Sequence, residues 1–544
     1  MHPERYNYHR KIQNDRLKES GVSLEGLLPP RRSWKKIGQS ERYRNGQLIN
    51  SFNKNVLAII KTIKWDKKNH PEKEYLKALS IFVADIKEKS SDSSYYFDSP
   101  KICPILKNHY NKEKTNICRP ISIYSLKEKV LLSAANKYFT DLFDFCFSPN
   151  SFAFRSCQTI SGRLKRLSHH DAFQSIIEYK KENLSKELFV SECDMMKFYD
   201  TVNHTIIKKR FERLLKIIGK TCAHKSSENA IRIFYRYLDS YTFTQNVYPL
   251  NNLQSHFDGF RINNGQYGWV EKELIEEKYY KTIKNTKIGI PQGGALSGLI
   301  ANMVLDYADR CVEKVLDKNS LYTRFCDDII IMNGDKKKCF EIYETYENAL
   351  RNLKLVPHSS QEKNQYDATF WKCKSKLPYK WTAKKNKGIP WIGFVGYELN
   401  CNCEIRVRRS SLKKEVNKQF ELIEEVMRAV SQGKNKTGFS KILKSVNQRL
   451  IGMSVGRVWL WNFEIANSEM CWLTGFKLLY SNKHLDKQLK NLDRTRNMYV
   501  RRLYNELHGL KSNGDPDENK NFQEIFYGKP FSYFYQIKRK SCIT

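Results

Sequence analysis

Residues 321–332 have the sequence LYTRFCDDIIIM, in which two apolar, β-prone segments flank the adjacent acids Asp327 and Asp328. This pattern predicts a β-hairpin that carries both carboxylates at its tip. Adjacent carboxylates repel each other and favour protonation, so the pair is costly unless a cation lies against it. The turn is therefore either an ordinary solvated acidic turn or a metal-binding turn.

A further acid follows another apolar segment. Residues 188–200 read LFVSECDMMKFYD, so Asp194 is expected to emerge at the end of a strand. A third carboxylate from a neighbouring strand would allow two ions to be held about 3.5 to 4 Å apart. Carboxylate oxygens suit Mg²⁺, with Mn²⁺ as an alternative. The resulting hypothesis is that Asp194, Asp327 and Asp328 hold two divalent ions together.

The charge balance narrows the class of partner. The 544 residues include 95 Lys and Arg against 58 Asp and Glu, a formal net charge of +37 that is spread along the whole chain. This excess predicts a polyanion as partner and binding that weakens as salt rises. The alternative is a basic protein with no such partner. No stretch approaches the ~18 apolar residues that span a bilayer, so a cytoplasmic location without membrane contact is expected.

The order of apolar segments predicts an α+β fold. Its regions are a basic N-terminal extension (1–100), a mixed strand and helix region (101–410) with a polar insertion (about 219–285), an amphipathic helix (411–432) and a helical basic region (437–544). In the last region Arg494, Arg501 and Arg502 are expected to face outward, either as a solvated basic face or as a grip on phosphates. The fourteen cysteines contain no CxxC pair, so reduced thiols are favoured over a structural metal.

Six segments, in chain order, resemble the motifs of reverse transcriptases. They are ICRPISI (117–123), FSPNSFAFRS (147–156), DMMKFYD (194–200), GIPQGGALSGLIANMVLDYADR (289–310), FCDD (325–328) and WIGFVGYEL (391–399). The first two are similar to fingers motifs of the branch that includes group II intron, retron and defence-associated bacterial enzymes. The resemblance implies a right-hand polymerase with an antiparallel-sheet palm and mixed fingers in 101–410, a helical thumb and an all-α C-terminal region.

The resemblance also implies roles around the incoming nucleotide. Tyr199 matches the aromatic ring that lies beneath the sugar and excludes a 2′-hydroxyl, with core packing as the alternative. Gln292 and Gly293 would line the pocket for the base and the template. Arg119 would neutralise the triphosphate, for which the forked donors of a guanidinium are suited. Deoxynucleotides are therefore the expected substrates.

Further side chains match the family less closely. Arg155 is a second candidate for phosphate binding, and Phe325 is a substrate contact that stands where the family usually has tyrosine. Lys363 would protonate the leaving pyrophosphate, with a plain surface lysine as the alternative.

Residues 396–408, GYELNCNCEIRVR, match the hairpin that grips the primer end in the family. Arg406, Arg408 and Arg409 would then lie near phosphates of the nucleic acid.

The resemblance implies an RNA-directed DNA polymerase that makes a DNA product from dNTPs on an RNA template. No HExxH motif, HNH-like pairing or ribonuclease H acid set is recognisable, which favours a bacterial defence-associated enzyme acting with a dedicated structured non-coding RNA. Some such relatives form homo-oligomers or prime from a protein hydroxyl, for which Tyr527, Tyr533 and Tyr535 qualify only by residue type. The alternatives are a group II intron maturase, a retron-type enzyme and a non-catalytic RNA-binding protein.

Overall fold

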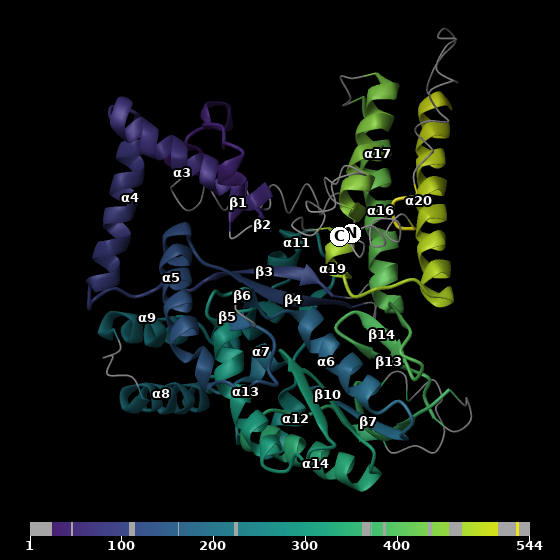
Figure 1. The fold of residues 1–544 in the computed structure, drawn as a ribbon. Helices are drawn as coiled ribbons and strands as arrows, with labels where there is room; N and C mark the ends of the chain where they lie inside the picture. The colour runs from purple at the N-terminus through teal and green to yellow at the C-terminus, as the bar shows by residue number, and fades with distance from the viewer. Residues whose placement is uncertain are drawn as a thin grey trace. The chain divides into compact units, whose positions relative to one another are not determined.

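The structure is a computed structural model. It describes residues 24–44, 47–49, 51–107, 115–160, 163–221, 227–361, 370, 373–383, 388–433, 438–455, 471–509 and 529–532. The chain divides into two compact units, one formed by Ser80–Val395 and the other by Met1–Leu79 with Gly396–Thr544. Figure 1 shows the elements of both units. Within the described ranges, no helix has the length and apolarity to cross a membrane.

The main sheet of the unit Ser80–Val395 has five strands. Their order is β11 (Ser360–Gln361), β12 (Ser375–Trp381), β7 (Leu188–Cys193), β10 (Asp328–Asn333) and β9 (Leu321–Phe325). Neighbours pair antiparallel, except that β11 and β12 are parallel. Ile329, Ile330 and Ile331 are all buried, although successive side chains of a strand point to opposite faces. Both faces of β10 are therefore covered.

Helices cover this sheet and fill the core around it. α14 (Lys336–Asn352) packs on β7, β10 and β12, and α6 (His169–Glu182) packs on β9. α13 (Ser297–Glu313) packs against α14 and α8 (His204–Thr221), as Figure 1 shows. Most side chains of α13 are buried, because its sequence is apolar around much of its circumference. The glycine-rich segment that precedes α13 is thereby fixed on the main core.

A second sheet has three strands and lies in the same unit. β3 (Lys101–Leu106) pairs antiparallel with β4 (Asn116–Ile123), and β8 (Gly265–Tyr267) pairs parallel with β4. The expected insertion thus contributes a strand to the sheet of the predicted fingers. Its apolar side chains Phe243 and Phe257 pack with Ile102 and Cys118 of the sheet.

The remaining described elements of the unit Ser80–Val395 are further helices and strands. They are α5 (Leu126–Phe143), η3 (Asp144–Cys146), β5 (Cys157–Ile160), β6 (Arg163–Arg166), α7 (Phe198–Thr201), α9 (Glu228–Asp239), α10 (Phe243–Asn246), η4 (Tyr248–Asn252), α11 (Gln254–Asp258), α12 (Glu271–Glu276) and β13 (Trp391–Phe394). α5 begins with a capping box, in which Ser125 and Glu128 satisfy each other's backbone N–H groups.

The second unit contains three long helices that lie side by side (Figure 1): α16 (Arg409–Ser431), α17 (Phe439–Val455) and α20 (Lys483–Gly509). Ile423, Leu450 and Leu503 belong to their shared apolar core. Before them, β14 (Tyr397–Asn400) and β15 (Ile405–Val407) form an antiparallel hairpin.

The other described elements around this unit come mainly from the N-terminal part of the chain. They are α2 (Leu24–Leu27), η1 (Arg31–Ser33), η2 (Ser40–Arg42), β1 (Tyr43–Arg44), β2 (Gln47–Leu48), α3 (Ser51–Asn69) and α19 (Trp472–Gly475), whereas α4 (Glu74–Ser91) has residues in both units. The predicted α+β class is confirmed: both acidic motifs lie on a mainly antiparallel sheet, and the only regular elements in the described residues after β15 are helices.

Candidate active site

The pairing of β7 with β10 brings two of the predicted metal ligands together. In the antiparallel register Ile329 lies opposite Cys193, and the adjoining residues are Asp328 and Asp194. Side chains that face each other across neighbouring strands share one face of a sheet. Asp194 and Asp328 therefore lie at the same end of two adjacent strands, although they are far apart in the sequence.

Asp327 lies in the turn of the hairpin formed by β9 and β10. Phe325 pairs with Asp328, so Cys326 and Asp327 make a two-residue turn, as the sequence pattern predicts. Cys326 has a φ of 61°, in the left-handed region that costs a non-glycine residue about 1 to 2 kcal/mol. Such a conformation persists only where the surrounding structure holds it.

The Cys326 side chain contacts the predicted sugar-sensing ring. Its sulfur lies 3.4 Å from the hydroxyl oxygen of Tyr199. The backbone oxygen of Tyr199 accepts a hydrogen bond from the N–H of Ile290 at 2.7 Å, which ties this residue to the glycine-rich segment. Burial raises the pKa of the Cys326 thiol to about 12 and also raises the pKa of Tyr199. Both groups are therefore neutral near pH 7.

Asp194 has two basic neighbours that the sequence did not reveal. Its Oδ2 lies 3.1 Å from Nζ of Lys374 and 3.9 Å from Nε2 of His358. Its Oδ1 accepts a hydrogen bond from the N–H of Met195 at 2.8 Å. No local spacing links Lys374 or His358 to Asp194, so only the fold could identify them.

A group of cations lies around Asp194. Burial lowers the pKa of Lys107, and repulsion from Lys197, Lys374 and Arg119 lowers it further. Burial likewise lowers the pKa of Lys197, with repulsion from Arg119 and Lys374 acting in the same direction. Cations that oppose one another's charge form an electrostatic site for a polyanion. Arg119 is thus placed with Lys107 and Lys197, neither of which the sequence singled out.

Gln292 and Gly293 lie beside this group of cations. The backbone oxygen of Gln292 accepts a hydrogen bond from the N–H of Ser122 on β4 at 2.9 Å. Its Nε2 donates to Oδ1 of Asp200 at 2.7 Å. Asp200 is completely buried, and this burial raises its pKa to about 6. Gly293 is exposed with a φ of 90°, a conformation that glycine adopts without strain.

Arg155 is placed in the protein interior. Its guanidinium is ion-paired with Asp144 at 2.8 Å and donates to the backbone oxygens of Ser148 and Ser151 at 2.8 and 2.7 Å. With 3% of its side chain exposed, it acts as a scaffold for this loop.

Phe325 is half-buried, and its ring meets His169 edge-on with 6.3 Å between centroids. Lys363 and the three tail tyrosines, Tyr527, Tyr533 and Tyr535, lie outside the residues that the structure describes.

The arginines predicted to grip nucleic acid all belong to the second unit. Arg406 donates from Nε to Glu398 at 2.6 Å, and Arg502 pairs with Glu424 at 2.8 Å. The exposed members of the set are Arg408, Arg409, Arg494, Arg501 and Arg502. Arg406 also lines a groove of about 460 Å³ together with Lys483 and Lys487. This unit therefore presents several cations on its surface.

The acidic donor set fits divalent ions. In the part of the chain that the structure describes, no three His, Cys, Asp or Glu side chains have the geometry to hold an ion unaided. Mg²⁺ keeps several waters and takes further ligands from substrate phosphates, so it needs few protein ligands. Asp194 already attracts the ammonium group of Lys374. Asp194, Asp327 and Asp328 together offer only carboxylate oxygens, the ligand type that this ion prefers.

Comparison with known proteins identifies a domain in this part of the chain. The family described as "Reverse transcriptase (RNA-dependent DNA polymerase)" matches residues 107–366, whereas no curated protein matches the chain. Similar solved structures include apo telomerase from Candida tropicalis, with 13% identity, a TM-score of 0.38, and coverage of 84% of this chain and 67% of that chain. Telomerase from Candida albicans in complex with a TWJ fragment of telomeric RNA has 13% identity, a TM-score of 0.31 and coverage of 84% and 68%. The family match alone identifies residues 107–366 as a reverse transcriptase domain, and it indicates an RNA-directed DNA polymerase.

Proposed function

We propose that this polymerase joins dNTPs on an RNA template at a site formed by Asp194, Asp327 and Asp328. The observation that carries the proposal is the register of β7 and β10, which sets Asp194 beside Asp328 at the end of the sheet. The turn adds Asp327 next to them. In this proposal the three carboxylates carried by these strand ends bind cations together, in contrast to an isolated acidic turn.

Reverse transcriptase domains generally use divalent metal ions, and Asp194, Asp327 and Asp328 would hold two Mg²⁺ ions here, with Mn²⁺ as a substitute. When bound, such ions lower the pKa of an attacking hydroxyl and neutralise charge on the phosphates. The protein orients the carboxylates. The N–H of Met195 fixes Oδ1 of Asp194, and the hairpin register fixes Asp328.

The cations near Asp194 bind the triphosphate in this proposal. The pKa values of Lys107 and Lys197 are lowered first by burial and then by repulsion from neighbouring cations, Arg119 among them. A triphosphate placed among them relieves this repulsion, and the guanidinium of Arg119 offers two parallel donors. In this proposal the nucleotide lies between the fingers strands and the acidic turn.

Tyr199 selects the sugar, and Gln292 with Gly293 contacts the base and template. The Tyr199 ring is held from its hydroxyl end by Cys326 and from its backbone by Ile290. In this proposal a ring fixed in this way collides with a 2′-hydroxyl, so deoxynucleotides are preferred. Gln292 is held by Asp200, so its position is also fixed before the nucleotide binds.

The cellular role that we propose is antiphage defence with a dedicated structured non-coding RNA in the cytoplasm. The support for this role is the resemblance of the fingers motifs to those of defence-associated bacterial enzymes, together with the net charge of +37. The exposed arginines of the second unit would grip the phosphates of such an RNA. Sequencing the RNA and DNA that copurify with the chain tests this role. An intron RNA flanking the gene in place of a dedicated RNA would favour a maturase, and size-exclusion chromatography with light scattering tests for a homo-oligomer.

Primer extension with the variant D328N tests the proposed site. The substitution keeps the shape of the side chain but removes the negative charge, so incorporation of dNTPs should be lost while RNA binding stays near the wild-type level. A matched control is D141N, which removes a surface carboxylate that pairs with Lys137. Full-length synthesis by D328N at the rate of D141N would exclude this site assignment.

A further inference from the structure

A buried arginine lies directly behind the acidic turn. Arg324 has no exposed surface, and its Nη1 donates to the backbone oxygen of Cys326 at 3.0 Å. Cys326 is the residue of the turn with the left-handed φ. The carbonyl of this residue is therefore held by a side chain that belongs to the same hairpin.

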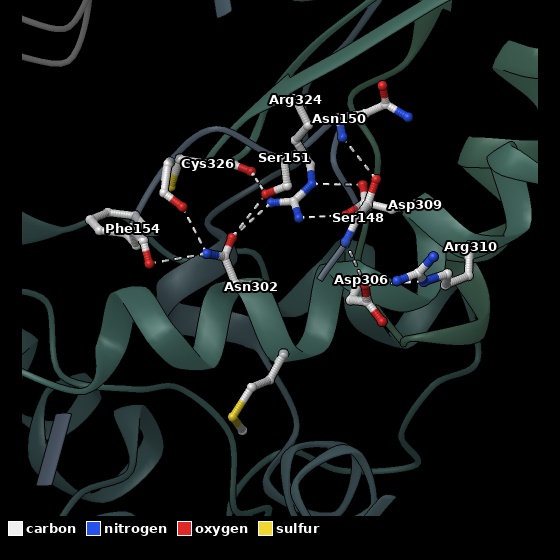
Figure 2. Close-up of polar contacts among 12 residues, drawn as sticks. Ser148, Asn150, Ser151, Phe154, Asn302, Asp306, Asp309, Arg310, Arg324 and Cys326 are labelled. Atoms are coloured by element: carbon white, nitrogen blue, oxygen red, sulfur yellow. Dashed lines mark hydrogen bonds and ion pairs between the residues drawn. The ribbon is translucent and has the colours of Figure 1, made fainter. Parts of the chain in front are cut away.

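Arg324 is itself anchored on helix α13. Its Nε and Nη2 donate to the two carboxylate oxygens of Asp309 at 2.8 and 2.6 Å. Nη1 also donates to the side-chain oxygen of Asn302 at 3.3 Å, and Figure 2 shows both partners around the guanidinium. Tyr322 donates its hydroxyl to the same Asp309 at 2.6 Å. These contacts fix the plane of the guanidinium and hence the direction of its bond to Cys326.

The same network holds the loop of residues 148–155 against the edge strand β9. The N–H of Arg324 donates to Asn150 at 2.9 Å, and its backbone oxygen accepts from the N–H of Phe152 at 3.0 Å. Asn302 donates to the backbone oxygen of Ala153 at 2.7 Å. Figure 2 shows this loop, the helix and the turn meeting at Arg324 and Asn302.

Packing alone does not account for a charged pair at this place. The side chains of Arg324 and Asp309 are both fully buried, and removing two charges from water costs several kcal/mol per ion before their attraction is counted. Apolar side chains would fill the same space without that cost. The contacts of this pair hold the guanidinium in one orientation, in which its Nη1 donates to the carbonyl of the left-handed turn residue Cys326.

We infer that Arg324 is a positioning residue for nucleotidyl transfer, because it holds the turn that carries Asp327 and Asp328. The inference rests on the proposed function, in which these two acids bind the metal ions. Arg324 does not contact the ions or the substrate. It acts through the backbone of Cys326, so its loss should alter the dependence on metal ions more than the binding of dNTPs.

The variant R324K tests the inference, with Y322F as its matched control. Lysine keeps the charge next to Asp309 but has no fork, so it cannot hold Asp309 and the Cys326 carbonyl together. Y322F removes a hydrogen bond to the same Asp309 and leaves the turn untouched. For R324K, the Mg²⁺ concentration that gives half-maximal incorporation should rise about 10-fold or more, as for other outer partners of metal ligands. The KM for dNTP should change much less, and Y322F should keep the wild-type Mg²⁺ dependence.

A rescue experiment separates the strain of the turn from general stability. Glycine adopts a φ near 60° without the cost paid by other residues. C326G should therefore restore part of the Mg²⁺ response that R324K loses. C326A removes the same thiol but keeps a Cβ, so it should restore none of it. Equal effects of C326G and C326A on R324K would overturn the inference.

Two further outcomes keep the test decisive. If R324K does not fold, N302A replaces it, because this change removes the amide beside Nη1 and leaves the ion pair with Asp309 intact. A wild-type Mg²⁺ response in a folded R324K or N302A protein, with only a lower melting temperature, would show a purely structural role. D328N, assayed in parallel, tests the proposed function separately, since its activity does not depend on what Arg324 does.

Discussion

The hydroxyl oxygen of Tyr199 lies 3.4 Å from the thiol sulfur of Cys326. This contact joins the ring proposed to select the sugar with the turn proposed to hold the metal ions. Tyr199 belongs to helix α7 and Cys326 to the turn between β9 and β10, so the two residues meet only in the folded chain. A side chain at position 326 can therefore influence both the metal site and the choice of sugar.

The variant C326A should weaken discrimination against ribonucleotides. Removing the sulfur leaves space behind the Tyr199 hydroxyl, so the ring can move away from the sugar. The ratio of kcat/KM for dATP over ATP should fall about tenfold, the lower end of the effect of one methylene-sized change in a pocket. Single-nucleotide incorporation on an RNA template measures this ratio.

Two controls accompany C326A. C326S keeps a small polar side chain next to the hydroxyl and should retain most of the discrimination. Y199A removes the ring and should lose more of it than C326A. An unchanged ratio in C326A would mean that the ring keeps its position without the sulfur.

Asp200 should make stability depend on pH in a definite direction. Burial raises its pKa from 3.8 to about 6 in the folded chain, so the folded state holds the proton more tightly than the unfolded state does. The contribution of this group to stability is therefore greatest below about pH 4 and falls as the pH rises to about 6. Above that pH it stays constant.

The variant D200N removes this titration and still offers an oxygen to Gln292. At pH 7 it should be more stable than the wild type by on the order of 3 kcal/mol, at about 1.4 kcal/mol per pKa unit. Urea unfolding of both proteins between pH 4 and 7 measures the difference. Burial lowers the pKa of His204 to about 4, so the contribution of this residue to stability rises with pH. His204 is present in both proteins, and its contribution therefore cancels in the difference between them. A stability difference that does not change with pH would contradict the assignment.

Arg155 should prove important for stability and not for nucleotide binding. R155M leaves the carboxylate of Asp144 buried without its partner, which typically costs about 3 to 5 kcal/mol. The melting temperature should fall clearly, while the KM for dNTP of the folded fraction stays within about twofold of the wild type.

The double variant R155M/D144N provides the control for this prediction. It removes the stranded charge, so part of the lost stability should return. A raised KM for dNTP with unchanged stability would instead return Arg155 to the role of a phosphate ligand.

The local features of the candidate site were predictable from the sequence. The hairpin at 321–332 is confirmed by the pairing of β9 with β10, because alternating apolar segments around a polar turn constrain a short piece of chain strongly. The strand before Asp194 is also present as β7. In the same way, the three- and four-residue spacing of apolar side chains predicted the long helix that the structure places at α16.

The neighbours of each acid were not predictable in this way. Lys374 and His358 lie next to Asp194 in space but follow it at long range in the chain. Arginine is a common phosphate ligand, so the sequence alone made Arg155 a candidate for phosphate binding. Only the structure shows that its donors are already bonded to Asp144. In the same way, nothing in the local sequence around Arg324 or Asp309 indicates that the two residues form a buried ion pair.

The sequence by itself determined the residue types, the strand ends that carry the acids and the overall positive charge, since these follow from local periodicity and composition. Only the tertiary structure decided which charges face one another, which arginines are buried and which side chains hold the turn. The physical reason is that periodicity records the face of an element that is buried, whereas the strength of an ion pair or hydrogen bond depends on distances between elements that no local pattern contains.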